Sequence, residues 1–206
     1  MLLAGLAVFL VTALRSLAGA ARARGDLAVP KGKASAGIAY SFTGGMAPWK
    51  KESAKRHPAV YALGVAYHLG TFLAFIWLAF VATGVSLPAV LRPLSAALLG
   101  ATALAGLVLL MRRIADSNLR YFSSPDDYFA NAVVTGFHVL AAAALVRPGA
   151  TGALLVYGGL LLAYIPVGKL KHSIYFGPAR YYLGLFYGRR GVWSDGGGAR
   201  WRSDRQ

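Results

Sequence analysis

The sequence predicts an all-α integral membrane protein: a bundle of five transmembrane helices, with the N-terminus outside and the C-terminus in the cytoplasm. The 206 residues are 57% hydrophobic and only 14% charged, a composition typical of membrane proteins and not of soluble domains. Uncharged apolar stretches of about 20 residues, the length that crosses a bilayer, recur along the chain. The basic residues that give the formal net charge of +15 lie between these stretches, where lysine and arginine set the orientation of membrane helices. The charge therefore does not indicate a nucleic-acid partner.

The first predicted span is Met1 to Arg22, and Arg15 within it is expected to snorkel to the interface. A secretory signal peptide is the alternative, but a basic n-region is missing and four further spans follow. Residues 22–56 are rich in Gly, Lys and Arg and predict a polar loop. The second span is predicted over residues 57–83, which contain no Asp, Glu, Lys or Arg.

The third and fourth spans are predicted over residues 93–111 and 128–146, both uncharged. The third closes on Arg112 and Arg113. Residues 124–127, with the sequence SPDD, predict the start of the fourth helix. They offer a hydroxyl cap, a proline in the first turn and acids at the positive end of the helix dipole, so both aspartates are interpreted as structural.

The fifth span is predicted over residues 148–168, which makes one membrane domain of residues 1–193 and leaves a flexible tail of residues 194–206. Of the 22 Lys and Arg, only Arg92 and Arg147 lie in the loops between spans 2 and 3 and spans 4 and 5. The positive-inside rule therefore places the C-terminus in the cytoplasm. We expect a multi-pass protein of a bacterial or archaeal cytoplasmic membrane, in contact with lipid, whose charged cytoplasmic face docks a partner.

The four histidines fall at two predicted depths. His57 and His68 are eleven residues apart on the second helix, so they leave the same face about 16 Å apart along its axis. The fourth helix runs in the same direction, which places His138 at about the depth of His68. His172 lies at the cytoplasmic end of the fifth helix, level with His57. The predicted pairs are His57 with His172 and His68 with His138.

Paired imidazoles in apolar helices predict two haem b groups. Ionisable residues inside a span are candidates for function, and the absence of cysteine and of acids in the spans disfavours zinc and di-iron carboxylate sites. Gly64, Ala141 and Ala142 would leave room for a flat macrocycle. A helix carbonyl or Thr135 is expected to pair with the second ring nitrogen of His138. The alternative is four independent histidines, each hydrogen-bonded within the bundle or at the interface.

Four stretches carry a family resemblance within residues 46–191: PWKKESAKRH, YHLG, LLMRRIADSNLRYFSSPDDYFAN and IPVGKLKHSIYFGPARYYLGLFYGRRG. The chain resembles the cytochrome b gamma subunit of respiratory nitrate reductase, and more closely the cytochrome b subunits of sulfite-reductase-linked and heterodisulfide-reductase-like membrane complexes. The resemblance implies five spans, two b haems, a quinone site near the outer haem and a cytoplasmic iron–sulfur partner. It also implies that His57 and His172 hold the inner haem, and that His68 holds one axial position of the outer one.

The sequence departs from this family at the second ligand of the outer haem. In the nitrate reductase subunit that ligand is a histidine on the last helix, about five turns before the one matching His172. Leu154 stands near that position here, and the stretch GALLVYGGLLLAY has no histidine. Either the outer haem takes His138 from the fourth helix, as the depth argument indicates, or that haem is absent.

The function expected from these features is electron transfer between a quinone, menaquinone or ubiquinone, and a cytoplasmic iron–sulfur subunit, with the terminal substrate reaction on another subunit of the complex. Arg92 is the candidate at the quinone, near where the nitrate reductase subunit has a lysine associated with quinone binding; the alternative is an interfacial anchor. Candidates to neutralise haem propionates, unless they only follow the positive-inside rule, are Arg56, Arg112, Lys169 and Lys171.

Two other classes of function compete with this one. A haem-free membrane anchor would only recruit a cytoplasmic enzyme. A small transporter would use the histidines as a proton relay, but such folds usually show repeats and broken helices with intramembrane acids, which this sequence lacks.

Overall fold

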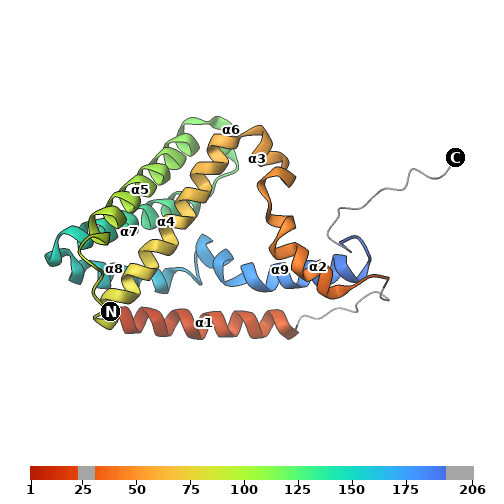
Figure 1. Cartoon of the computed structure of the whole chain (residues 1–206), viewed down its shortest axis with the longest axis horizontal. Helices are drawn as coiled ribbons and strands as arrows, with labels where there is room; N and C mark the ends of the chain where they lie inside the picture. The colour runs from red at the N-terminus through yellow and green to blue at the C-terminus, as the bar shows by residue number, and fades with distance from the viewer. Residues whose placement is uncertain (23–30, 194–206) are drawn as a thin grey trace. The chain divides into compact units, whose positions relative to one another are not determined.

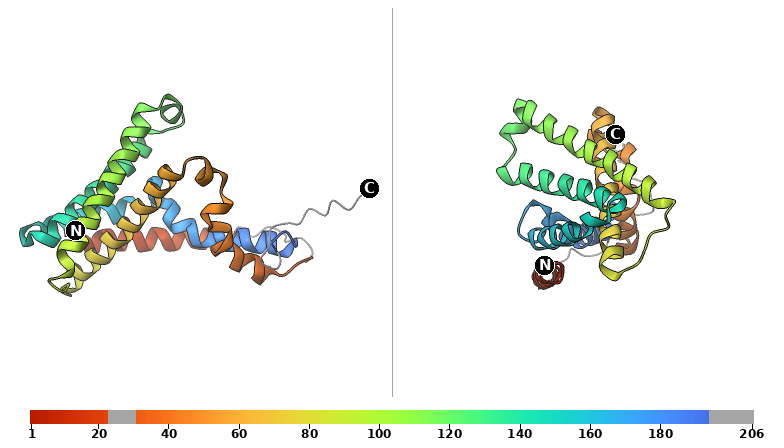
Figure 2. Two further views of the ribbon diagram at one scale, coloured as in Figure 1. Left: turned by 45° about the horizontal axis from the view of Figure 1, so that its top comes forward. Right: turned by 90° about the vertical axis from the view of Figure 1, so that its left-hand side faces the viewer.

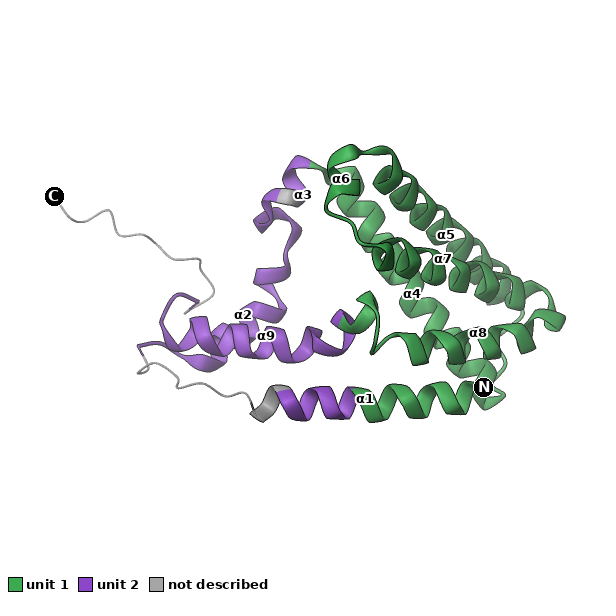
Figure 3. Cartoon of the chain, turned by 180° about the vertical axis from the view of Figure 1, so that it is seen from behind, with its two compact units in different colours: residues 1–12, 57–171 green, residues 13–56, 172–206 purple. Residues whose placement is uncertain are grey.

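The computed structural model describes residues 1–22 and 31–193 and is helical throughout, with no strand among these residues. The chain divides into two compact units (Figure 3): unit 1 comprises residues 1–12 and 57–171, and unit 2 comprises residues 13–56 and 172–206. The predicted flexible tail, residues 194–206, lies outside the described residues.

Unit 1 is built from four main helices (Figure 1), namely α4 (Pro58–Thr83), α5 (Leu91–Ala115), α7 (Pro125–Val146) and α8 (Thr151–Tyr164). Helix α5 packs against α4 and α7, and α8 packs against α4 and α7; α5 and α7 run side by side (Figure 2). The core holds Leu99, Phe137, Leu154 and Leu161, which are almost completely buried. The first residues of α1 (Leu2–Arg22) also belong to this unit, and Gly5 lies so close to Gly159 of α8 that a Cβ would collide with its backbone.

The limits of α4 and α7 follow from local chemistry that the sequence predicted. Pro58 stands in the first turn of α4, and Gly84 ends the helix in the left-handed conformation at φ 73°, which glycine adopts without steric cost. At the start of α7 the Ser124 N–H donates to Asp127 Oδ2 over 2.8 Å as part of a capping box. The predicted cap and the structural role of Asp127 are confirmed. Asp126 accepts a 2.5 Å hydrogen bond from Tyr164.

Within the described residues four helices, α1, α4, α5 and α7, are long and apolar enough to cross a membrane. A fifth span exists only if α8 and α9 (His172–Arg189) are counted together as one broken span. The prediction of one continuous helix over residues 148–168 is wrong. Helix α8 ends at Tyr164 because Pro166 cannot donate the next helical hydrogen bond.

The chain between α8 and α9 contains only a short 3₁₀ turn, η4 (Lys169–Lys171). His172 is therefore the first residue of a new helix, α9, and not the last residue of the helix that begins after Arg147. A second short 3₁₀ turn, η3 (Pro148–Ala150), leads into α8. The connection between α5 and α7 contains the short helix α6 (Ser117–Tyr121), capped by the carboxylate of Asp116.

In unit 2 the predicted polar loop over residues 22–56 is wrong in its described part, which is largely helical. It contains α2 (Ala34–Phe42), η1 (Gly44–Met46), η2 (Pro48–Lys50) and α3 (Glu52–Arg56). Helices α2 and α9 pack side by side (Figure 1). Small residues permit this approach, because a Cβ at Gly37 would collide with the backbone of Gly184 and Gly188. The sequence did not predict α2 because α9, the helix that packs against it, lies far along the chain.

Candidate functional site

The ring of His68 is exposed, and a carbonyl of its own helix orients one of its nitrogens. Its Nδ1 lies 2.7 Å from the carbonyl oxygen of Gly64, one turn earlier on α4. A carbonyl oxygen only accepts, so Nδ1 carries the proton and Nε2 presents a lone pair. A hydrogen bond of this kind orients an imidazole that binds a metal. A Cβ at Gly64 would meet no atom within 4 Å, which leaves open space beside the ring.

His57 stands immediately before α4, as its N-cap residue, and is exposed. His57 precedes His68 by eleven residues but has non-helical backbone angles, φ −134° and ψ 64°. That both histidines leave one face of the helix stays a prediction. His172, the predicted partner of His57, is exposed at the start of α9. His57 belongs to unit 1 and His172 to unit 2, and their pairing as ligands of one iron stays a prediction.

His138 has a different setting, because it is 0% exposed and both of its ring nitrogens are engaged. Nε2 lies 3.0 Å from the hydroxyl of Thr71 on α4, and Nδ1 lies 3.1 Å from that of Thr102 on α5. The Tyr67 ring packs against the imidazole at 5.0 Å between centroids. A neutral imidazole donates through one nitrogen and accepts through the other, and a hydroxyl can do either. His138 thus links three helices through hydrogen bonds.

In the described arrangement neither ring nitrogen of His138 is open to an iron shared with His68. Iron needs a free ring nitrogen on each histidine, whereas both nitrogens of His138 face threonines and His68 opens to the outside of the bundle. The predicted pairing is untested by this geometry, since ligation would replace one threonine bond, and it stays a prediction. Thr135 is not the partner expected for His138; its hydroxyl lies 2.8 Å from the Tyr67 hydroxyl.

Sequence reasoning missed Thr71 and Thr102. The available signal was a hydroxyl inside each of two apolar spans, but such a residue usually bonds its own helix. Both hydroxyls lie within hydrogen-bond distance of a carbonyl of their own helix, that of Tyr67 for Thr71 and that of Leu99 for Thr102. Because a neutral His138 donates through one nitrogen only, one hydroxyl donates to its helix carbonyl and the other donates to the ring. Only the packing of three helices brings them to one imidazole.

The basic residues predicted at haem propionates are dispersed. Arg56 belongs to unit 2 and forms a 2.5 Å ion pair with Glu52. Lys169 lies 3.3 Å from a carboxylate oxygen of Asp127. Arg112 is half-buried in the last turn of α5, and Lys171 is exposed in η4. Arg112, Lys169 and Lys171 share unit 1 with three of the histidines, whereas Arg56 does not.

A small cavity lies at the C-terminal end of α4, and Arg92 is linked to its wall through Leu87. The Nε of Arg92 donates a 3.0 Å hydrogen bond to the carbonyl of Leu87, and Leu87 lines this cavity of about 30 Å³. Trp77 also lines it, and the buried indole Nε1 of Trp77 has no hydrogen-bond partner among the described residues. A buried donor without an acceptor is costly, and the cavity has room for a water or for one acceptor atom of a ligand.

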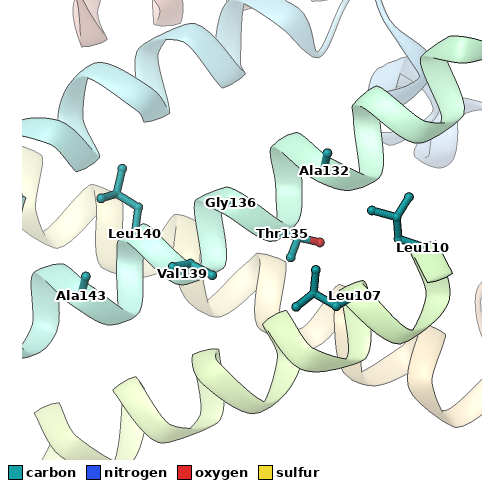
Figure 4. Close-up of a pocket in the computed structure, with 8 residues that line it drawn as sticks. All are labelled: Leu107, Leu110, Ala132, Thr135, Gly136, Val139, Leu140 and Ala143. Carbon is teal, nitrogen blue, oxygen red and sulfur yellow. The ribbon is translucent and has the colours of Figure 1, made fainter.

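A larger hollow of about 520 Å³, which we name the α5/α7 groove, lies between α5 and α7 (Figure 4). Thr135 supplies its one hydroxyl, and the other lining side chains are apolar. In a membrane such a surface suits a hydrocarbon chain. The groove is lined by Leu107, Leu110, Ala132, Thr135, Gly136, Val139, Leu140 and Ala143.

Within residues 1–22 and 31–193 no group of three or more His, Cys, Asp or Glu side chains is placed to hold a metal ion. The chain matches no protein-family model, no curated protein and no solved structure.

Proposed function

We propose that the chain is a di-haem cytochrome b subunit of a membrane oxidoreductase, carrying electrons between a membrane quinone and a cytoplasmic iron–sulfur subunit. The observation that carries this proposal is the setting of His68. It combines a proton fixed on Nδ1, a free Nε2 and open space at Gly64, within a helix able to cross a membrane. The family resemblance of residues 46–191 points the same way.

The residues of α4 fit the binding of haem b. His68 would hold iron through Nε2, with its ring orientation set by Gly64, and His57 would hold a second iron nearer the cytoplasm. When bound, haem b supplies reversible one-electron transfer. The second ligands are predicted to be His172 for His57 and His138 for His68, and the latter would first have to release a threonine.

The cavity beside Trp77, of about 30 Å³, is the proposed place for one carbonyl oxygen of the quinone. Trp77 follows His68 by nine residues, about 13 Å along the helix, toward the outer side in the predicted topology. Its unpartnered indole N–H would donate to a quinone carbonyl. Arg92 holds the adjoining Leu87 carbonyl and so shapes the cavity wall without itself being aimed at the ligand.

The iron–sulfur partner is proposed to dock on the cytoplasmic face. Residues 31–56 carry six lysines and arginines against one acid, Glu52, and Trp49 is 70% exposed among them. A large exposed aromatic among charges is typical of protein interfaces. The chain has no cysteine, so any cysteine-ligated cluster must come from such a partner.

A reduced-minus-oxidised absorbance spectrum of the purified chain tests the function directly. The wild type should show b-type haem bands, and His68→Ala should lose a share of them. Leu69→Ala is the matched control, since Leu69 is exposed next to His68 and offers no ligand. A wild-type protein without haem bands would overturn the proposal.

The second candidate is a haem-free anchor for a cytoplasmic enzyme. One observation favours it: both nitrogens of His138 are already satisfied by threonines, as in an ordinary packed histidine. The same spectrum separates the two candidates, because an anchor would show no haem bands and would still co-purify with its enzyme.

A further inference from the structure

Helices α2 and α9 of unit 2 form an antiparallel pair, which we name the α2/α9 hairpin, with its small residues on the inside. Gly37 faces Gly184, Gly188 lies against the carbonyl of Lys33, and the hydroxyl of Ser41 bonds the carbonyl of Arg180. Because small residues fill the contact between the helices, the large side chains of α9 point away from it.

An apolar stripe therefore runs along the exposed side of α9. Phe176, Leu183 and Phe186 are 45%, 39% and 42% exposed, and their spacing of seven and three residues keeps them on one face of the helix. Phe42 of α2, 42% exposed, meets Phe176 edge-on with ring centroids 6.4 Å apart. A contiguous exposed apolar surface of this kind marks an interaction site.

Cations lie against the aromatic residues of this hairpin. The guanidinium of Arg190 stands 3.5 Å from the centroid of the Phe186 ring, and that of Arg180 stands 5.8 Å from the Phe176 ring. Residues 172–193, which contain α9, carry three arginines and no acid.

We infer that the α2/α9 hairpin is a membrane-surface element that binds anionic phospholipid: its apolar stripe enters the boundary between headgroups and acyl chains, and its cations contact the headgroups. Helices that lie on membranes combine an apolar face with flanking lysines and arginines. Aromatic rings favour that depth, and the anionic surface attracts each nearby cation. The inference depends only on unit 2 and is independent of the haem proposal.

The absence of native cysteine allows a direct test in the full chain. Single-cysteine variants Phe176→Cys and Leu183→Cys, labelled with bimane and reconstituted into vesicles containing phosphatidylglycerol, should be quenched by lipids with a nitroxide near the headgroup. Aqueous iodide should quench them weakly. Arg120→Cys, at an exposed cationic position of α6 in unit 1, is the control that iodide should quench. Quenching of both stripe labels by iodide would overturn the inference, and so would protection from both quenchers, which would mean that protein covers the stripe.

A second arm tests the charge. In the Leu183→Cys background, Arg190→Gln should lower the ratio of lipid to iodide quenching by about fivefold in anionic vesicles, the effect of one cation near such a surface. In vesicles of phosphatidylcholine alone it should change nothing. Arg147→Gln removes an exposed cation of unit 1 and should have no effect in either membrane. An unchanged ratio in Arg190→Gln would overturn the role of anionic headgroups.

Discussion

The hydroxyl of Ser41 donates a hydrogen bond of 2.6 Å to the main-chain carbonyl of Arg180, 139 residues later in the chain. Gly37 lies one turn before Ser41 on α2, and it contacts Gly184, which lies one turn after Arg180 on α9. The two helices therefore run antiparallel. Two short helices that pack in this way lie at the same side of the membrane. The contact therefore constrains how often the intervening chain crosses the bilayer.

The first prediction is the topology. The chain between α2 and α9 must cross an even number of times, and α4, α5 and α7 are each long enough to cross. The fourth crossing should therefore be made by α8, which has only 14 residues, together with the turns on either side of it. With the N-terminus outside, an alkaline phosphatase fused at residue 206 should be inactive and a green fluorescent protein there should be fluorescent. A phosphatase inserted after Arg147 should be active. Phosphatase activity at residue 206 would contradict this topology.

The second prediction concerns the glycines between α2 and α9. In Gly184→Ala the new Cβ would press on the Ile38 backbone, which cannot move aside as a side chain can, and such overpacking costs about 1–3 kcal/mol. Amide hydrogen exchange of α2 should therefore accelerate. Gly177→Ala is the control on the same helix, because a Cβ there meets no atom within 4 Å. Equal exchange rates in the two variants would show that α2 does not depend on this contact.

The third prediction compares how much His68 and His138 contribute to the free energy of unfolding. His138→Ala leaves Thr71 and Thr102 bonded to their own helices but opens a cavity in the core, at a cost of roughly 2–4 kcal/mol. His68→Ala removes an exposed ring and should cost less than about 0.5 kcal/mol. Thermal unfolding of the purified variants measures this difference. Equal midpoints would mean that His138 does not hold α4, α5 and α7 together.

The haem content of these variants tests the predicted ligand pair. If His68 and His138 share the outer haem, each alanine variant should lose one haem and keep the inner haem of His57 and His172. Full haem content in His138→Ala would assign His138 to packing alone. His57→Ala serves as the complementary variant, since it should spare the outer haem.

The fourth prediction concerns the indole at the proposed quinone cavity. Trp77→Phe keeps an apolar ring in place and removes the unpartnered N–H. The free energy of unfolding should therefore not fall, whereas the rate of haem reduction by added quinol should. Trp49→Phe is the control, because Trp49 is 70% exposed on unit 2. Unchanged quinol-dependent reduction in Trp77→Phe would exclude this indole from quinone binding.

The sequence alone determined those features that depend on local physics. The uncharged stretch of residues 57–83 became α4 at almost the predicted limits, because bilayer thickness fixes the length of an apolar helix. The start of α7 was predictable because Ser124 and Asp127 cap it within four residues. The orientation of His68 also depends on a neighbour one turn away.

The tertiary structure decided what depends on residues distant in the chain. His138 was predictable as a residue of a span, but its threonine partners lie 67 and 36 residues away, and only the packing of α4 and α5 against α7 brings them to the ring. Helix α2 was mistaken for loop because its short sequence has no long apolar stretch. Its stability comes from close contact with glycines of α9, and contacts over such separations leave no periodic pattern in the sequence.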